Sequence, residues 1–297
     1  MPNAQRELQR LIVLGQTRSA SECIRLTPIH SLARQAWINA ICVVLGFHVL
    51  FGEPRQAAAD EKPSSKTHQP IPTEAAPEEL KRLITDGNVT VVYDADPEFV
   101  ELRRGWADFQ VRLTQSFKYN LIKTRQRDHW RIKLVVTKLE PKIELTHLIR
   151  IPASFKSAKI WQSTLLRHEF DHVAVSLDPR AMLLLRHLLA HLPVIERTLK
   201  PGEEPTDERL SHFINEEVEL RQQAVVDLMR QNNKLLDKVG SHGTLPVPDR
   251  AAFFAKLYSK ENLAEQKFRY IDQVLKLLET KDYHNAHLRF QSRDPTE

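Results

Sequence analysis

One short stretch near the middle of this 297-residue chain, LLRHEFDHVAVSL at residues 165–177, constrains the fold more than any other. Its large apolar residues recur at helical steps of four, three and four, at Leu166, Phe170, Val173 and Leu177. Such a stripe predicts a helix with one face against a core. The imidazole and carboxylate side chains fall on the face turned away from the stripe. The stretch therefore predicts a helix that lies between a packed core and a cleft.

The polar face of this predicted helix carries an H-E-x-x-H motif, in which Glu169 directly follows His168 and His172 comes four residues after His168. Residues four apart lie on the same face of a helix, so both imidazoles can bind one tetrahedral metal ion. Glu169 then lies beside that ion, where it can accept a proton from a metal-activated water. The motif predicts a hydrolytic zinc site with its own general base. The alternative is a surface helix whose histidines bind nothing.

A catalytic zinc site needs a third protein ligand and one open position. The only cysteines are Cys23 and Cys42, so beyond them the third ligand must be a His, Asp or Glu. The candidates after the motif are His187, His191, Glu196, His212, Glu216, Glu217, Glu219, Asp237 and His242. Spacing alone leaves the choice among them open. A di-iron site is not indicated, because it needs a Glu-x-x-His pair on a second helix and no other predicted helix carries one.

Strand-like spacing precedes this helix. Residues 88–96 are a β-branched run that predicts a strand, and residues 97–117 then show helical spacing. The runs 130–136 and 143–151 alternate between apolar and polar residues on either side of the sequence LEPK. We expect these two runs to pair as antiparallel strands with one buried face.

Helix-like spacing follows. Asp178 and Pro179 form an N-cap and first-turn pair that should end one helix and begin the next. Long helices are also expected at 207–239 and 249–278. Strands followed by helices predict an α+β fold. More specifically, we expect a zincin-like fold: a small antiparallel sheet, then the active-site helix, then a C-terminal half built from long helices.

The first part of the chain has the layout of an export signal. Five arginines precede residues 36–52, the most apolar run of the chain, and the small residues 57–59 offer a cleavage site. If the signal is not cleaved, residues 36–52 would contact or anchor to a membrane. A buried core helix is the remaining alternative for this run. Net charge is +5 and is spread along the chain, so no nucleic-acid partner is indicated.

These features predict four parts. They are a basic region with a signal peptide or signal anchor at 1–52, a disordered linker at 53–79, a zincin-like metallohydrolase domain at 80–245 and a helical extension at 246–297. The linker is expected from a composition rich in Pro, Ala and Ser, which cannot bury enough apolar surface to become ordered. We expect the mature domain in the periplasm or on the cell surface.

The order of the motifs resembles that of a bacterial family described as secreted zinc-dependent proteases and catalogued as a domain of unknown function. The similar segments are VVYDADPEFVEL, the predicted strand pair, HEFDHVAVS, a long helix and LDKVGSHG, between Val89 and Gly243. The family pairs its HExxH helix with a later Tyr-Asp-x-x-Thr-x-His-Gly segment. This chain matches that segment at Asp237, His242 and Gly243.

The chain departs from the family at three positions. Leu236 replaces the usual Tyr, Gly240 replaces the usual Thr, and Asp171 stands where Gly is frequent. If the family uses its late histidine as a ligand, the resemblance implies that His242 is the third zinc ligand.

Motif and resemblance together predict an exported zinc-dependent metallohydrolase, a peptidase acting on a peptide or protein substrate. Zn²⁺ would be bound by His168, His172 and His242, with Glu169 as general base. The alternative is an exported or membrane-anchored protein that binds metal, or has only a structural role, without turnover.

Overall fold

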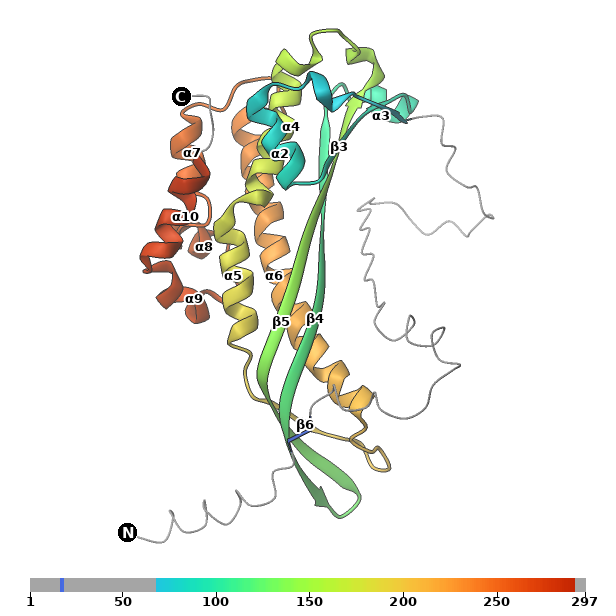
Figure 1. Cartoon of the computed structure of the whole chain (residues 1–297), viewed down its shortest axis with the longest axis vertical. Coiled ribbons are helices and arrows are strands. Elements are labelled where there is room, and N and C mark those ends of the chain that lie inside the picture. Colours follow the sequence, from blue (N-terminus) through green and yellow to red (C-terminus); the bar gives the residue numbers. More distant parts are fainter. Residues whose placement is uncertain (1–16, 19–67, 292–297) are drawn as a thin grey trace, which may run out of the picture.

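The computed structural model describes residues 17–18 and 68–291, which form one elongated α+β structure (Figure 1). Its strands are β1 (Thr17–Arg18), β2 (His68–Pro70), β3 (Val89–Asp94), β4 (Trp106–Gln126), β5 (His129–Pro152) and β6 (Ile195–Thr198). Its α-helices are α2 (Glu78–Asp86), α3 (Pro97–Glu101), α4 (Thr164–Leu177), α5 (Pro179–Ala190), α6 (Asp207–Gly240), α7 (Arg250–Lys256), α8 (Lys260–Glu265), α9 (Ile271–Leu278) and α10 (Lys281–Gln291). The predicted α+β class is confirmed.

A long hairpin of β4 and β5 runs the length of the molecule (Figure 1). The strands turn at Arg127 and Asp128, and Arg127 has the left-handed φ of 53° that tight turns use. The predicted hairpin about LEPK is therefore wrong, because both alternating runs belong to the single strand β5. Pro141 lies within β5 opposite Gln115. Of the described strands only β4 pairs with β5 there, so the missing N–H of proline interrupts no second ladder.

The helical spacing predicted for residues 97–117 holds only for the five residues of α3, and most of the remainder is strand β4. Residues four apart lie on one side of a helix and also on one side of a strand, so Phe109 and Leu113 fit either element. Val111 decides between them, because it shares their side only in a strand. All three side chains pack against the helices on the same face.

The sheet is mixed, whereas the sequence predicted an antiparallel one. β3, which confirms the strand expected at 88–96, pairs in parallel with the end of β5. β2 pairs antiparallel with β3, and β6 pairs with the start of β5. At the end of β3 the fully buried carboxylate of Asp94 forms an ion pair with Arg150 of β5. This pair fixes the parallel strands at the end of the sheet near α4.

Residues 68–79, which composition assigned to the linker, belong to the fold. They include β2, and the side chains of Ile71 and Ala76 are only 4% and 5% exposed. These two residues pack into a core cluster with β3 and α4. A few apolar side chains are enough to order this segment because the surface that covers them is already formed by the rest of the domain. The remainder of the predicted linker, 53–67, lies outside the described residues.

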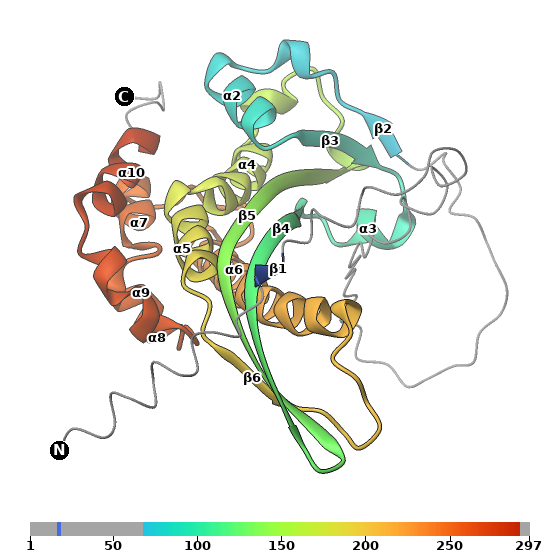
Figure 2. The ribbon, with the colours of Figure 1, turned by 60° about the horizontal axis from the view of Figure 1, so that its bottom comes forward.

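Helices α4, α5 and α6 cover one face of the hairpin (Figure 2). Two of their boundaries follow the predicted capping. The Ser163 hydroxyl accepts a hydrogen bond from the N–H of Leu166 at the start of α4, and Asp178 caps α5, whose first residue is Pro179. α6 runs for 34 residues and confirms the long helix expected at 207–239.

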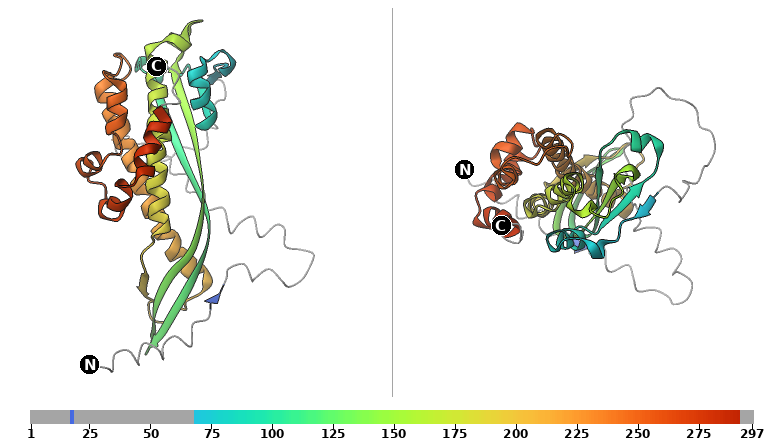
Figure 3. Two further views of the ribbon diagram at one scale, coloured as in Figure 1. Left: turned by 60° about the vertical axis from the view of Figure 1, so that its left-hand side comes forward. Right: turned by 90° about the horizontal axis from the view of Figure 1, so that it is seen from above.

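The C-terminal helices form a further layer on the far side of α5 and α6 from the hairpin (Figure 3). One helix was expected at 249–278, but the chain forms α7, α8 and α9. The breaks contain Tyr258 and Lys267, whose φ values are 59° and 52°. Tyr258 is fully buried and its hydroxyl donates to the carbonyl of Val175 on α4, a contact that a continuous helix would not make. Ser259 then caps α8.

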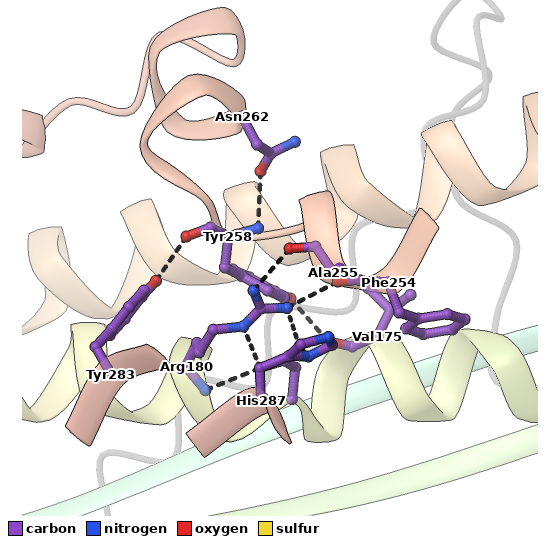
Figure 4. A network of polar contacts seen from close by, with 9 residues as sticks. Val175, Arg180, Phe254, Ala255, Tyr258, Asn262, Tyr283 and His287 are labelled. Carbon is purple, nitrogen blue, oxygen red and sulfur yellow. Dashed lines mark hydrogen bonds and ion pairs between the residues drawn. The ribbon is translucent and has the colours of Figure 1, made fainter. Parts of the chain in front are cut away.

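A buried polar network joins this layer to the junction of α4 and α5 (Figure 4). The guanidinium of Arg180 pairs with Asp178 at 2.7 Å and donates to the carbonyls of Phe254 and Ala255. His287 of α10 lies 3.6 Å from the Asp178 carboxylate. Side chains from α7 to α10 share one core cluster with α5 and α6, so the residues predicted as an extension pack into the main domain.

Among the described residues, no helix is both long and apolar enough to cross a membrane. The predicted export signal at 1–52, with its apolar run, lies outside the described residues except for Thr17–Arg18, which pair with β4.

Candidate metal centre

Helix α4 has the apolar core-facing stripe that the sequence predicted, but its polar face is buried, whereas the sequence predicted that this face would be open to a cleft. Leu166, Phe170 and Val173 are at most 1% exposed and pack in the core with β3 and the end of β5. The two motif histidines face the last turns of α6 instead, where they meet Asn233 and Asp237. Packing of the apolar stripe therefore fixes the rotation of α4 and aims its histidines at α6.

Three potential ligand atoms converge between these two helices. The Nε2 atoms of His168 and His172 are 3.2 Å apart, and each lies 3.2 Å from Oδ1 of Asp237. Among the described residues these three form the one group of His, Cys, Asp or Glu side chains that could hold a metal ion. Asp237 was one of the candidates left open by spacing.

The size of this triangle fits a metal site. Ligand atoms at about 2.0–2.2 Å from a tetrahedral ion are separated by roughly 3.3–3.6 Å, close to the observed distance of 3.2 Å. Two imidazoles and a carboxylate are a donor set that zinc accepts, and a fourth tetrahedral position remains for water or substrate. The donor chemistry and geometry of His168, His172 and Asp237 therefore fit a tetrahedral metal ion such as zinc.

A hydrogen bond behind His172 prepares it for this role. Its Nδ1 lies 3.0 Å from Oδ1 of Asn233, one helical turn before Asp237 on α6. An amide oxygen only accepts, so Nδ1 carries a proton, and Nε2 would present its lone pair to a metal ion at the centre of the triangle once the proton that it shares with Asp237 is released. Such outer partners orient a ligating histidine and fix its tautomer.

His168 is held by close packing instead. A Cβ on Gly240 would lie 2.9 Å from Nδ1 of His168, and a Cβ on Gly243 would lie 3.2 Å from its Cβ. The absence of side chains at these two positions lets the end of α6 close over the imidazole. Gly240, where the similar family has Thr, is thus required for this contact. Nδ1 of His168 is buried without a hydrogen-bond partner among the described residues.

Glu169 lies on the other side of the histidines, under the start of β4. A Cβ at Gly105 would overlap its carboxylate, and the N–H of Ala107 donates a hydrogen bond to it. Burial raises the pKa of Glu169 to about 7, with attraction to His172 and Arg104 opposing that rise. Oε2 has no partner among the described residues. A carboxylate with one free oxygen and a pKa near neutrality is suited to accept and return a proton.

Asp237 remains ionised in this setting. Burial by itself would raise the pKa of Asp237, but hydrogen bonds from His168 and His172 outweigh burial and hold that pKa well below its usual range. The carboxylate is about one-third exposed, so this corner of the triangle faces solvent. A permanently charged ligand on the open side suits the binding of a dication.

His242 lies next to the triangle but outside the group of three ligand atoms. Its Nδ1 is 3.2 Å from Oδ1 of Asp237 and its side chain is 55% exposed. Ser241, His242 and Gly243 all have positive φ, so the chain turns sharply where α6 ends and places His242 beside Asp237. The structure therefore brings His242 to the site, as a neighbour of the carboxylate.

The remaining candidate ligands have other partners or lie away from this group. The ring of His187 on α5 lies 4.3 Å from that of His191, which follows the helix. Glu216 pairs with His212, Glu217 pairs with Arg197 and Arg221, and Glu196 pairs with Arg131 and Lys133. Two features of the sequence favour a position for Asp237 at this site. It lies four residues after Asn233, so the ligand and the partner of His172 share one face of α6, and it precedes the turn that carries His242.

Comparisons with protein-family models, curated proteins and solved structures found no match to this chain.

Proposed function

We propose that the protein is a zinc-dependent metallohydrolase of the HExxH type that cleaves peptide bonds. Its ligands are His168, His172 and Asp237, and Glu169 is its general base. The observation that carries the proposal is the triangle of ligand atoms with 3.2 Å sides beside a buried carboxylate. Zinc bound there would supply Lewis-acid chemistry, activating water and polarising a carbonyl.

Side chains and backbone groups near the triangle would transfer the proton, position the base and contact the substrate. Glu169 accepts a proton from the attacking water and returns it to the leaving amine. The N–H of Ala107 and the close approach of Gly105 hold its carboxylate in place. His242 lies on the solvent side of Asp237, within reach of a substrate that enters there.

Strand β4 offers a place for an extended substrate. Besides β5, its described strand partner is β1, which pairs only at Tyr119 and Asn120. The other edge of β4 from Trp106 onward is unpaired by any described strand and begins beside Glu169, and a peptide there would displace the hydrogen bond that Gln222 of α6 donates to the carbonyl of Val111. An extended peptide can add to such an edge through backbone hydrogen bonds. This arrangement supports a peptide or protein as the substrate and a zincin-like interpretation of the fold.

The proposal retains export to the periplasm or cell surface, which rests on the basic and apolar composition of residues 1–52. Membrane contact would occur through residues 36–52 if the signal is not cleaved.

A second candidate is an exported protein that binds zinc at the same site without turnover. The observation that favours it is the burial of Glu169, whose side chain is only 2% exposed and is covered by the segment at Gly105. If Glu169 cannot reach a substrate, the three proposed ligands could still bind zinc.

Glu169→Gln separates the two candidates. Tag-free wild-type protein and variant are loaded with zinc, the zinc content is measured by mass spectrometry, and hydrolysis of a quenched-fluorescence peptide library is followed. The proposal expects equal zinc content and loss of hydrolysis, because Gln cannot accept the proton. Glu216→Gln, an exposed glutamate on α6, is the matched control and should keep full activity. A wild-type protein that binds zinc but hydrolyses no peptide would favour the second candidate. A Glu169→Gln variant as active as the wild type would refute Glu169 as the general base.

A further inference from the structure

A cavity of about 370 Å³ lies on a second side of α4, between α2, α4 and the chain from Leu245 to Phe254. Of the three residues of the metal triangle, only His168 also lines the cavity. Neither Asp237 nor Glu169 contributes to the lining. The cavity is therefore a separate site from the metal centre, in contact with one of its ligands.

The walls of this cavity are mainly apolar. They include Leu80, Leu83, Phe170, Leu245, Val247 and Phe254. Leu80, Phe170 and Phe254 are at most 8% exposed and form a fixed floor, whereas Leu245 is 56% exposed. The volume lies within the range of pockets that bind small molecules, roughly 300–1,000 Å³. An apolar ligand would bury the floor and the exposed Leu245 together.

Four of the six carboxylate and guanidinium side chains that line the cavity form ion pairs with each other. Arg82 pairs with Asp86 at 3.2 Å, and Arg250 pairs with Asp171 at 2.8 Å. Glu79 lies in the first turn of α2, where the helix N-terminus stabilises a carboxylate. Arg167 has no hydrogen bond or ion pair from its guanidinium in the part of the chain that the structure describes. The cavity thus combines an apolar interior with one exposed guanidinium that forms no ion pair within the described part of the chain.

We infer that this cavity binds a small amphipathic carboxylate, such as a medium-chain acyl group, with its chain against the apolar floor and its carboxylate on Arg167. A guanidinium binds a carboxylate through two parallel N–H···O bonds, which an amine or alcohol headgroup cannot form. The inference does not depend on hydrolysis, because it needs only the cavity and its charge. Its ligand would touch the side of His168 away from Asp237.

Titration calorimetry with decanoate tests this inference on the full chain after removal of metal with a chelator. We expect saturable binding of one decanoate per chain, with decylamine binding at least about tenfold more weakly. Arg167→Gln should weaken decanoate binding about tenfold or more, whereas Arg186→Gln, on exposed α5 surface, should leave it unchanged. Val247→Trp fills the cavity from its half-exposed wall and should abolish binding. Circular dichroism and thermal melts verify that each variant is folded.

Three outcomes would overturn the inference. The first is that decanoate does not bind to folded wild-type protein. The second is that Arg167→Gln and Val247→Trp bind decanoate as tightly as the wild type does. Alternatively, binding requires added zinc and disappears in Asp237→Asn, which would place the carboxylate on the metal centre. Asp237 does not line the cavity, so under the inference Asp237→Asn retains decanoate binding in metal-free protein.

Discussion

The burial of Glu169 predicts that this residue destabilises the metal-free protein at neutral pH. Its side chain is 2% exposed, and burial raises its pKa from 4.5 to about 7. The unfolded chain therefore releases this proton at lower pH than the folded chain. Between about pH 4.5 and pH 7 the folded state becomes progressively less favourable, and the penalty is constant above that range.

The size of the penalty follows from the two pKa values. A rise from 4.5 to about 7 corresponds to roughly 3 kcal/mol in the free energy of unfolding. Glu169→Gln keeps the shape of the side chain and removes the charge. We expect the metal-free variant to be about 2–3 kcal/mol more stable than the wild type at pH 8, with little difference near pH 4.

Urea unfolding of both proteins at several pH values, with a chelator present, measures this difference. The gain in stability should grow as pH rises through the window from about 4.5 to 7. Glu216→Gln, whose side chain is 42% exposed, should stay within about 0.5 kcal/mol of the wild type at every pH. A Glu169→Gln variant that is less stable than the wild type at pH 8, or a difference that does not depend on pH, would refute the reasoning.

Three further changes test the surrounding contacts. Asp178→Ala leaves the buried guanidinium of Arg180 without its carboxylate partner. We expect the free energy of unfolding, measured in urea, to fall by about 3–5 kcal/mol, far more than for an exposed Asp→Ala control. Gly105→Ala introduces a Cβ that would overlap the Glu169 carboxylate, so peptide hydrolysis should fall while the zinc content stays unchanged. Unaltered hydrolysis would contradict this contact. Asn233→Leu removes the hydrogen-bond partner of His172, a proposed ligand, so zinc affinity in a chelator competition assay should fall about 10–100-fold. Unchanged zinc affinity would show that this hydrogen bond does not support the site.

The sequence predicts a helix or strand of this fold correctly where a single local pattern, such as an apolar stripe, a cap or a β-branched run, favours one kind of element. The stripe of α4 and the Asp178-Pro179 cap predicted the site helix and the start of α5 correctly. The β-branched run predicted β3 in the same way. These signals involve neighbouring residues and do not depend on tertiary partners.

The errors occur where two periodicities agree or where distant contacts decide. Phe109 and Leu113 suit a helix and a strand equally well, and Pro141 suggests a turn although an edge position tolerates it. The break at Tyr258 reflects a hydrogen bond to α4, which no local pattern contains. Likewise, the motif places His168, Glu169 and His172 on one helix, but the position of Asp237 beside the two histidines depends on which turn of α6 faces α4.

The most direct test of the metal centre is zinc affinity across its proposed ligands. Tag-free wild type, His168→Ala, His172→Ala, Asp237→Asn and His242→Ala are titrated with zinc against a chromophoric chelator. We predict one tight zinc site per wild-type chain, a loss well beyond 100-fold for the first three variants, and at most about 100-fold for His242→Ala, which contacts only Asp237. Absence of tight zinc binding in the wild type, or full affinity in His168→Ala or His172→Ala, would contradict the site. Full affinity in Asp237→Asn with loss in His242→Ala would contradict the third ligand proposed here and support the one implied by the family resemblance.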